Sequence, residues 1–390
     1  MKNTVIYLDN AAATRTDPDV VKSMLPYFTE TYAVASSQFS HTPGILAKEG
    51  LDRARKILAD KLRCMPEEVI FTSGGTESNN LALKGLAQAY RGQKDHIVCS
   101  KIEHNSVLHS CQWLEKEGFR LTTMNVDEEG FVDLDQLKKS ITDKTFLVSI
   151  QHGNQEVGTL QPIEAIGKLC KEKGVLFHTD AALSFTQLDL DVNRIHADLV
   201  TVSAHKIHGP KGVGALYVRK GTKLKKIQHG GYSEFDLRPG TENVAGAVGF
   251  GKAVELAQPE HVEFIRSLQK TLCDRLVQEV EGVEINGPKD LNKRLPGNVN
   301  VSFRRIEGES VVLHLDMKGI SVITGSACFS RSLEPSYVMM AMGFSHERAH
   351  GSIRFSFSRF NTAEEIHAVI ESCKEVVEAL RKISPLKDKE

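Results

Sequence analysis

The sequence predicts an α/β protein whose core is a mainly parallel β-sheet. Between about residues 69 and 220, short apolar runs alternate with helical stretches, which is typical of parallel strands joined by helical crossovers. The runs are apolar almost throughout, as expected for strands that are covered on both faces. The expected strands are 69–75, 96–100, 146–150, 175–181 and 199–206, and the clearest helices between them are 78–90 and 163–174.

A smaller α+β domain is expected in the last third of the chain. A long amphipathic helix starts near His261, with apolar residues at helical spacing. The strand-like runs that follow it are 298–303 and 352–358, and the helical runs are 310–318 and 364–383. We predict a large domain over 15–260 and a small domain made of 1–14 and 261–390.

The overall composition gives no case for nucleic acid or a membrane as a partner. The 390 residues carry 49 Lys and Arg against 50 Asp and Glu, so the charges nearly cancel. No apolar run approaches the roughly 20 residues that a transmembrane helix needs. The apolar part of the N-terminal stretch MKNTVIYLDN is too short for a signal peptide. We therefore expect a cytoplasmic protein that binds neither membranes nor, directly, nucleic acid.

The seven cysteines predict reduced thiols. Their number is odd, they are scattered, and none forms a C-x-x-C pair, so neither a disulfide framework nor a structural zinc site is expected. Reduced thiols fit the cytoplasm.

Three of the expected strands end in residues that can do chemistry. Ligands of open parallel sheets bind beyond the carboxyl ends of the strands. A Ser-Gly-Gly-Thr turn at 73–76 leads into a helix, Asp180 ends a second strand, and Lys206 ends a third. Such a turn offers free N–H groups and a hydroxyl to a phosphate. A carboxylate pairs with a protonated ring nitrogen, and a lysine forms a Schiff base with an aldehyde.

These three features together predict a site for pyridoxal phosphate (PLP), which carries a phosphate, a pyridine ring and an aldehyde. Each alone has an ordinary explanation. Taken alone, Lys206 would be explained as a solvated strand-end lysine and Asp180 as a helix cap. The turn would be explained as a tight connection between a strand and a helix. Their combination in one sheet is much more specific than any one of them.

With these residues in view, the chain resembles the cysteine desulfurases of the NifS/IscS type, which are class V aminotransferases with the fold type I of PLP enzymes. The resemblance covers nearly the whole chain and implies a seven-stranded, mainly parallel sheet flanked by helices, plus a smaller α+β C-terminal domain. It is carried by YLDNAAATRTDP, SGGTESNN, EHNSVL, HGNQEVGTLQPI, HTDAA, SAHKIHGPKGVGALYV, RPGTENVAGAVGFGKA, TGSACFSRSLEPS and SIRFSFSRF.

The resemblance implies roles around the cofactor. Lys206 resembles the Schiff-base lysine, Asp180 the partner of the pyridinium nitrogen, and His104 the histidine that stacks on the ring and assists proton transfers. From the residues alone, an ordinary helix-start histidine is the simpler explanation of His104. The implied phosphate ligands are Gly75, Thr76, Ser203 and His205.

Further implied roles concern the substrate and the second subunit. Asn154 resembles the residue near the cofactor O3′ and the substrate. Arg354 resembles the clamp for the substrate carboxylate, which suits the planar fork of arginine, although a surface strand residue is the ordinary alternative. Thr241 resembles a residue that reaches a phosphate in the neighbouring subunit, which implies a homodimer with shared active sites.

Cys328 stands among small and polar residues, in TGSACFSRSLEPS, which favours a flexible loop. The resemblance implies that PLP chemistry converts L-cysteine to L-alanine and leaves a persulfide on Cys328. An acceptor protein, such as an iron–sulfur scaffold or a thiolation protein, then takes the sulfur. No metal site is implied, apart from a transient contact of Cys328 with an iron–sulfur cluster under assembly.

Several positions depart from the pattern of these enzymes. Leu183 stands where they have a glutamine that donates to O3′, so we expect the pKa of the Schiff base to rise by about one to two units. The other departures are AVASS at 33–37, SEFD at 233–236, and Phe357 and Ser358. They leave open a related PLP lyase acting on selenocysteine or a modified cysteine, and a catalytically weak sulfur-relay scaffold.

Overall fold

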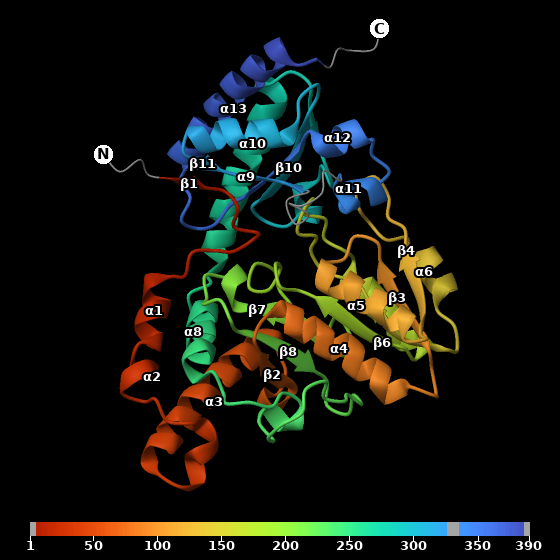
Figure 1. Cartoon of the computed structure of the whole chain (residues 1–390), viewed down its shortest axis with the longest axis vertical. Coiled ribbons are helices and arrows are strands. Elements are labelled where there is room, and N and C mark those ends of the chain that lie inside the picture. Colours follow the sequence, from red (N-terminus) through yellow and green to blue (C-terminus); the bar gives the residue numbers. More distant parts are fainter. Residues whose placement is uncertain (1–4, 326–334, 386–390) are drawn as a thin grey trace.

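The molecule has a larger and a smaller part, each built on its own β-sheet, with the larger part below in Figure 1. The computed structural model describes residues 5–325 and 335–385. No helix among these residues is long and apolar enough to span a bilayer.

The large sheet has seven strands in the order β2-β8-β7-β6-β5-β3-β4. All run in one direction except β8, which is antiparallel to both of its neighbours. This confirms the predicted seven-stranded, mainly parallel sheet. The strands are β2 (Val69–Thr72), β3 (His96–Ser100), β4 (Arg120–Met124), β5 (Thr145–Ser149), β6 (Leu176–Asp180), β7 (Leu199–Ser203) and β8 (Gly214–Val218).

Helices bury both faces of this sheet, and alternate side chains of each strand enter opposite cores. In β2, Phe71 joins the core beneath α3, α7 and α8, whereas Ile70 joins the core beneath α4 and α5. The double burial explains why the strand runs are apolar almost throughout. The helices of this part are α1 (Pro18–Met24), α2 (Pro26–Thr29), α3 (Thr42–Leu62), α4 (Gly75–Tyr90), α5 (Asn105–Lys116), α6 (Leu134–Ser140), α7 (Ile163–Lys173) and α8 (Val244–Glu255).

The smaller part has a four-stranded antiparallel sheet in the order β12-β13-β10-β9. These strands are β9 (Val283–Ile285), β10 (Asn298–Phe303), β12 (Ile323–Thr324) and β13 (Ser352–Ser356). Its helices are α9 (Pro259–Glu279), α10 (Gly308–Met317), α11 (Tyr337–Ala341), α12 (His346–His350) and α13 (Ala363–Ile383). The division near residue 260 stays a prediction; in the structure, α8 ends at Glu255 and α9 begins at Pro259.

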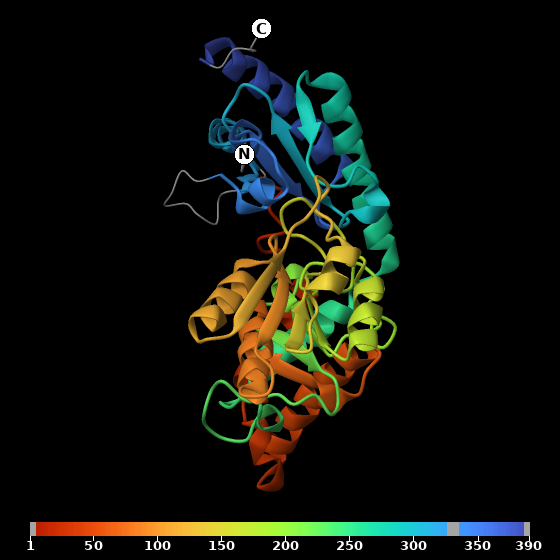
Figure 2. The ribbon, with the colours of Figure 1, turned by 90° about the vertical axis from the view of Figure 1, so that its right-hand side faces the viewer.

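The N-terminal segment connects the two parts (Figures 1 and 2). Strand β1 (Ile6–Tyr7) pairs in parallel with β11 (Ile320–Ser321) in the smaller part. Just beyond β1, the Ser356 N–H donates to the Leu8 carbonyl at 2.7 Å. The chain then crosses to the large sheet, where the Thr14 N–H donates to the His205 carbonyl at 2.9 Å. Residues 8–14 therefore run along the junction of the two parts.

Candidate active site

A cavity of about 500 Å³ opens where the carboxyl ends of β2, β6 and β7 meet the N-terminal segment. Three strand-end features predicted from the sequence line it together: the turn at 73–76, Asp180 and Lys206. The other lining residues are Ala12, Ala13, Glu77, Asn79, His104, Ser106, Gln151, Gly153, Gln155, Ala182, Leu183, Ser203, His205, Lys211 and Gly212.

The turn before α4 forms an anion cradle. Gly74 has φ +150° and ψ −178°, a conformation open essentially only to glycine. Hydrogen bonds among the described residues leave the backbone N–H groups of Gly75, Thr76 and Glu77 unused. These N–H groups stand at the positive end of the α4 dipole, which favours a bound phosphate.

The glycines that follow Lys206 allow strand β8 to approach this cradle. A Cβ atom on Gly214 would lie 2.7 Å from the Gly74 Cα, which is closer than real Cβ atoms come to other heavy atoms. Only glycine at the start of β8 therefore lets the cradle pack against the sheet.

Two side chains beside the cradle complete its polar wall. Ser203 Oγ lies 2.9 Å from His205 Nδ1. Burial lowers the pKa of His205 to about 4, and the positive charge of Lys206 adds to this effect. The imidazole is therefore neutral near pH 7.

A carboxylate also stands at the cradle, which the sequence did not lead us to expect. Glu77 accepts from the Ser73 N–H at 2.6 Å and from Arg238 Nε at 3.0 Å. Although burial alone would raise it, these hydrogen bonds lower the pKa of Glu77. Arg238 thus offsets a negative charge that would otherwise oppose a bound phosphate.

Asp180 is held at the end of β6 with both oxygens engaged. Its Oδ2 accepts from Asn79 Nδ2 at 2.7 Å, and its Oδ1 accepts from the Ala182 N–H at 3.0 Å. These two donors hold the carboxyl group in place at the edge of the cavity, where it can accept from a protonated ring nitrogen.

Lys206 sits in a short 3₁₀ turn (Ala204–Lys206) directly after β7. Its Nζ donates to the Ala11 carbonyl at 2.5 Å and to the Ala12 carbonyl at 2.8 Å. The N-terminal segment therefore positions the lysine within the cavity wall.

His104 is the N-cap of α5, and its Nδ1 accepts from the Ser106 N–H at 3.1 Å. Desolvation by the surrounding protein lowers the pKa of His104, although the Asp180 carboxylate acts in the opposite direction. The ring is therefore mostly neutral at pH 7. Because Nδ1 accepts a hydrogen bond, the neutral ring carries its proton on Nε2.

The structure does not bring Asn154 into the cavity. Its side chain is fully buried, donates to the Ile102 carbonyl, and accepts from the backbone N–H groups of Glu156 and Val157. The adjacent Gln155 lines the cavity instead. Gln155 Nε2 donates to the Tyr337 hydroxyl at 3.1 Å. The HGNQEVG motif thus reaches the cavity, but it does so through the side chain of Gln155 and not through that of Asn154.

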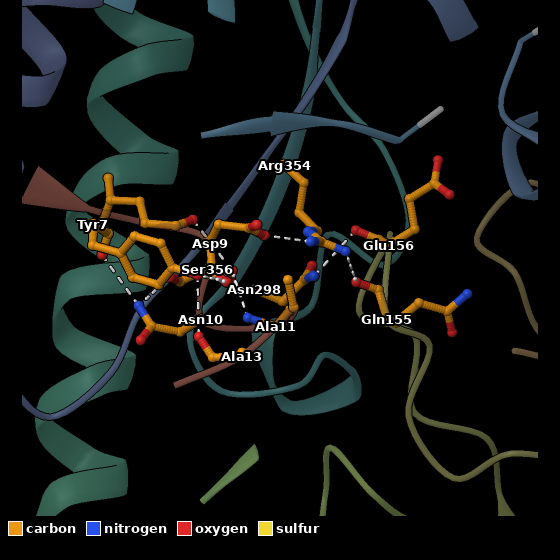
Figure 3. Close-up of polar contacts among 12 residues, drawn as sticks. Tyr7, Asp9, Asn10, Ala11, Ala13, Gln155, Glu156, Asn298, Arg354 and Ser356 are labelled. Atoms are coloured by element: carbon orange, nitrogen blue, oxygen red, sulfur yellow. Dashed lines mark hydrogen bonds and ion pairs between the residues drawn. The ribbon is translucent and has the colours of Figure 1, made fainter. Parts of the chain in front are cut away.

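Arg354, on β13, lies behind the cavity wall. Its Nη1 donates to the Gln155 carbonyl at 3.0 Å, and its Nη2 donates to Asp9 Oδ1 at 2.5 Å (Figure 3). Thr241 is exposed and is not among the residues lining this cavity. The described chain therefore brings Arg354 next to the site but leaves Thr241 outside it.

The departures from the family pattern separate into two groups. Leu183 lines the large cavity and, with Lys206, also lines a second cavity of about 70 Å³, to which Phe357 and Ser358 contribute. Segments 33–37 and 233–236 line neither cavity as the structure describes them. In the second segment, Glu234 instead forms a buried ion pair with Arg55 on α3 at 2.6 Å.

The described cysteines are poor candidates for nucleophiles. Burial raises the pKa of the thiols of Cys64, Cys170 and Cys373 to about 12, and thiols with such values are not thiolates near neutral pH. Cys328 lies outside the described residues.

Taken as a set of donors and acceptors, the cavity fits PLP. The cradle matches a phosphate, Asp180 matches a protonated ring nitrogen, and Lys206 matches an aldehyde. Four positions in or behind the cavity wall were missed from the sequence: Glu77, Asn79, Gln155 and Asp9. Each lies inside a quoted motif, but no spacing rule indicates which side chain of a motif faces a ligand.

Comparisons with known proteins identify the family of the chain. The family profile for Aminotransferase class-V matches residues 6–369. Cysteine desulfurase IscS of Clostridium botulinum is 46% identical over 387 residues, covering 98% of this chain and 97% of the relative. Cysteine desulfurase IscS of Methanosarcina thermophila is 47% identical over 392 residues, covering 100% and 96%.

Solved structures give the same result. A NifS-like protein superposes with a TM-score of 0.90 at 35% identity and covers 97% of this chain and 100% of its own. SspA in complex with cysteine superposes with a TM-score of 0.81 at 36% identity and covers 92% of this chain and 100% of its own.

Proposed function

Because this chain belongs to the aminotransferase class-V family, and within it to the cysteine desulfurases, we propose that it uses PLP to convert L-cysteine to L-alanine and passes the sulfur to an acceptor protein. The observation that carries the proposal is the single cavity shared by Lys206, Asp180, His104 and the cradle at 74–76.

When bound, PLP supplies an aldehyde that joins to amino groups and a ring that stabilises negative charge at the substrate's α-carbon. Lys206 would hold the cofactor through its aldehyde, and its amino group, when free, would move protons at the substrate carbons. Asp180 keeps the ring nitrogen protonated. The N–H groups of Gly75 and Thr76, with Ser203 and His205, hold the phosphate.

His104 stacks on the ring in this proposal. Its lowered pKa keeps the imidazole neutral at pH 7, so the side chain adds no positive charge to a site that already contains Lys206 and Lys211. A neutral ring is also able to take part in proton transfers near neutral pH.

Arg354 binds the substrate carboxylate, and Cys328 takes the sulfur. The thiolate of Cys328 attacks the sulfur of L-cysteine, and the Cβ–S bond breaks with its electron pair staying on Cβ. Cβ takes up a proton, so the carbon skeleton leaves as L-alanine and the sulfur stays on Cys328 as a persulfide. The role of Cys328 rests on the resemblance, since the residue lies outside the described part of the chain.

The cellular setting is part of the proposal. We propose a homodimer in which Thr241 reaches a phosphate of the neighbouring subunit, an iron–sulfur scaffold or a thiolation protein as the acceptor, and a cytoplasmic location. The exposed position of Thr241 supports the first of these, because a cavity-lining role within one chain is not available to it.

A second candidate is a lyase of the same family that acts on selenocysteine or a modified cysteine. The observation that favours it is Leu183, which lines the cavity where a hydrogen-bonding glutamine is expected. A substrate panel that scores alanine, sulfide and selenide separates the two activities.

The test is incubation of the PLP-loaded protein with L-cysteine, with alanine and a persulfide on Cys328 followed by mass spectrometry. Borohydride reduction and peptide mapping should place a pyridoxyl group on Lys206. Cys328→Ser should keep that label and lose alanine production. A pyridoxyl group on another lysine, or full turnover by Cys328→Ser, contradicts the proposal.

A further inference from the structure

The guanidinium of Arg354 is already paired with a carboxylate of its own chain. Nη2 donates to Asp9 Oδ1 at 2.5 Å, and the two side chains are only 9% and 17% exposed. Figure 3 shows the guanidinium between Asp9 on one side and Gln155 on the other. An ion pair this well shielded from water is screened little by salt, so each charge strongly affects the other.

Backbone contacts fix Asp9 in this position. Asp9 bridges to Ser356 on β13, and the Ala11 N–H donates to Ser356 Oγ at 2.9 Å. Arg354 and Ser356 are two residues apart on one strand, so they face the same side. The N-terminal segment therefore holds Asp9 against Arg354.

A second carboxyl group, Glu156, lies near the guanidinium but contributes less charge. Its pKa is raised to about 7 by burial, against the effects of a hydrogen bond with Ser336 and of the positive charge of Arg354. Near neutral pH it is partly protonated. Asp9 is therefore the main negative charge at Arg354.

A substrate carboxylate must share Arg354 with Asp9. The guanidinium has five N–H donors, and Asp9 and Gln155 use two of them. The buried Nε has no hydrogen-bond partner among the described residues, so donors remain for a second carboxylate. Two carboxylates on one guanidinium repel each other, however, and do so more strongly away from bulk water.

We propose that Asp9 is a positioning residue that orients Arg354 and, through its charge, weakens the binding of amino-acid carboxylates. This inference rests on the proposed role of Arg354 as the carboxylate clamp. The consequence is a compromise: the charge that lowers the affinity for L-cysteine also favours release of L-alanine, which carries the same carboxylate.

The test compares two ligands, one that carries the carboxylate charge and one in which esterification removes it. Binding of L-alanine and of L-alanine methyl ester to the PLP-loaded protein is measured by isothermal titration calorimetry. Asp9→Asn keeps a side-chain oxygen that accepts from Arg354 but removes the negative charge. We expect the Kd for L-alanine to fall at least threefold, and the Kd for the ester to stay unchanged. Asp9→Glu, which keeps the charge, should retain the weaker binding of L-alanine.

Asp17→Asn is the matched control. Asp17 pairs with Arg359 at 2.6 Å, with side chains 13% and 10% exposed, so the two ion pairs are similarly buried. This control should leave the preference for L-alanine over its ester unchanged. If Asp9→Asn does not fold, the neutral variant Asp9→Ser carries the same comparison.

Two outcomes overturn the inference in different ways. An unchanged preference in Asp9→Asn, with the preference lost in Arg354→Gln, rejects the role of Asp9 and leaves the proposed function intact. A preference that persists in Arg354→Gln rejects Arg354 as the clamp, and the inference falls with that part of the proposed function.

Discussion

The cavity and the polar cluster behind it are built in different ways. Asp180, Lys206 and the 74–76 cradle stand at the ends of strands of one sheet. Behind the cavity wall, Arg354 pairs with Asp9, which lies 345 residues away in the sequence, and donates to the carbonyl of Gln155, whose side chain lines the cavity. The comparison teaches that the proposed cofactor side of the site follows from the order of strands, whereas the Arg354 cluster needs three segments that are far apart in the sequence.

The largest effect should follow a change in one of the residues at the strand ends. Lys206→Ala should slow conversion of L-cysteine to alanine by about 10³-fold or more, because both covalent attachment and proton transfer are lost. Lys211→Ala is the control, since Lys211 lines the same cavity but does not end a strand; it should lose less than about tenfold. Steady-state alanine formation measures both. Equal losses in the two variants would show that charge alone, and not position at the strand end, is what matters.

A smaller effect should follow from a change in the Arg354 cluster. Arg354→Gln should raise KM for L-cysteine about 10- to 100-fold with little change in kcat, since a hydrogen bond to a charged group contributes about 1.5–3 kcal/mol. Arg359→Gln, which removes the neighbouring ion pair, should leave KM within about threefold of the parent. A fall in kcat at constant KM would instead assign Arg354 to the cofactor side of the comparison.

Neighbouring positions within one motif should behave oppositely. Asn154→Ala should lower the free energy of unfolding by about 2 kcal/mol, because it leaves the buried backbone N–H groups of Glu156 and Val157 without their acceptor. Gln155→Ala should change stability by less than about 0.5 kcal/mol but raise KM. Urea unfolding and kinetics on both variants test this. Normal stability with lost substrate binding in Asn154→Ala would restore the sequence-based expectation for that residue.

The smallest effect concerns Leu183 and the pKa of the Schiff base of the bound cofactor. Leu183 lines the cavity and cannot donate a hydrogen bond, so Leu183→Gln should lower the pH midpoint of the bound cofactor's visible absorbance by about one unit. This is the lower end of the range, because water in an open cavity supplies part of the missing hydrogen bond. Leu183→Met, a packing control, should leave the midpoint in place. An unchanged or higher midpoint in the glutamine variant would leave Leu183 as a packing residue only.

Most of the large sheet could be predicted from the sequence because its strands are doubly buried. The run at 199–206 contains β7, and the run at 175–181 contains β6. Strand β4 was missed because it is the edge strand and its Arg120–Met124 run is partly exposed and mostly polar, so it gives neither a continuous apolar run nor a strict alternation.

The substrate side could not be read from the sequence in the same way. Nothing in YLDNAAATRTDP indicates that Asp9 meets Arg354, because the contact depends on the pairing of the N-terminal segment with β11 and β13, far along the sequence. Asn154 and Gln155 are equally polar neighbours, and only the loop conformation decides that the first bonds to the backbone and the second faces the cavity.

The pairing of β1 with β11 has a consequence for chain synthesis. Arg354 is made 345 residues after Asp9, which is roughly 20 to 70 s later at common translation rates of about 5–20 residues per second. Asp180 and Lys206 are made well before Arg354. During that interval the nascent chain contains Asp9, Asp180 and Lys206, and the Asp9–Arg354 ion pair can form only when the interval is over.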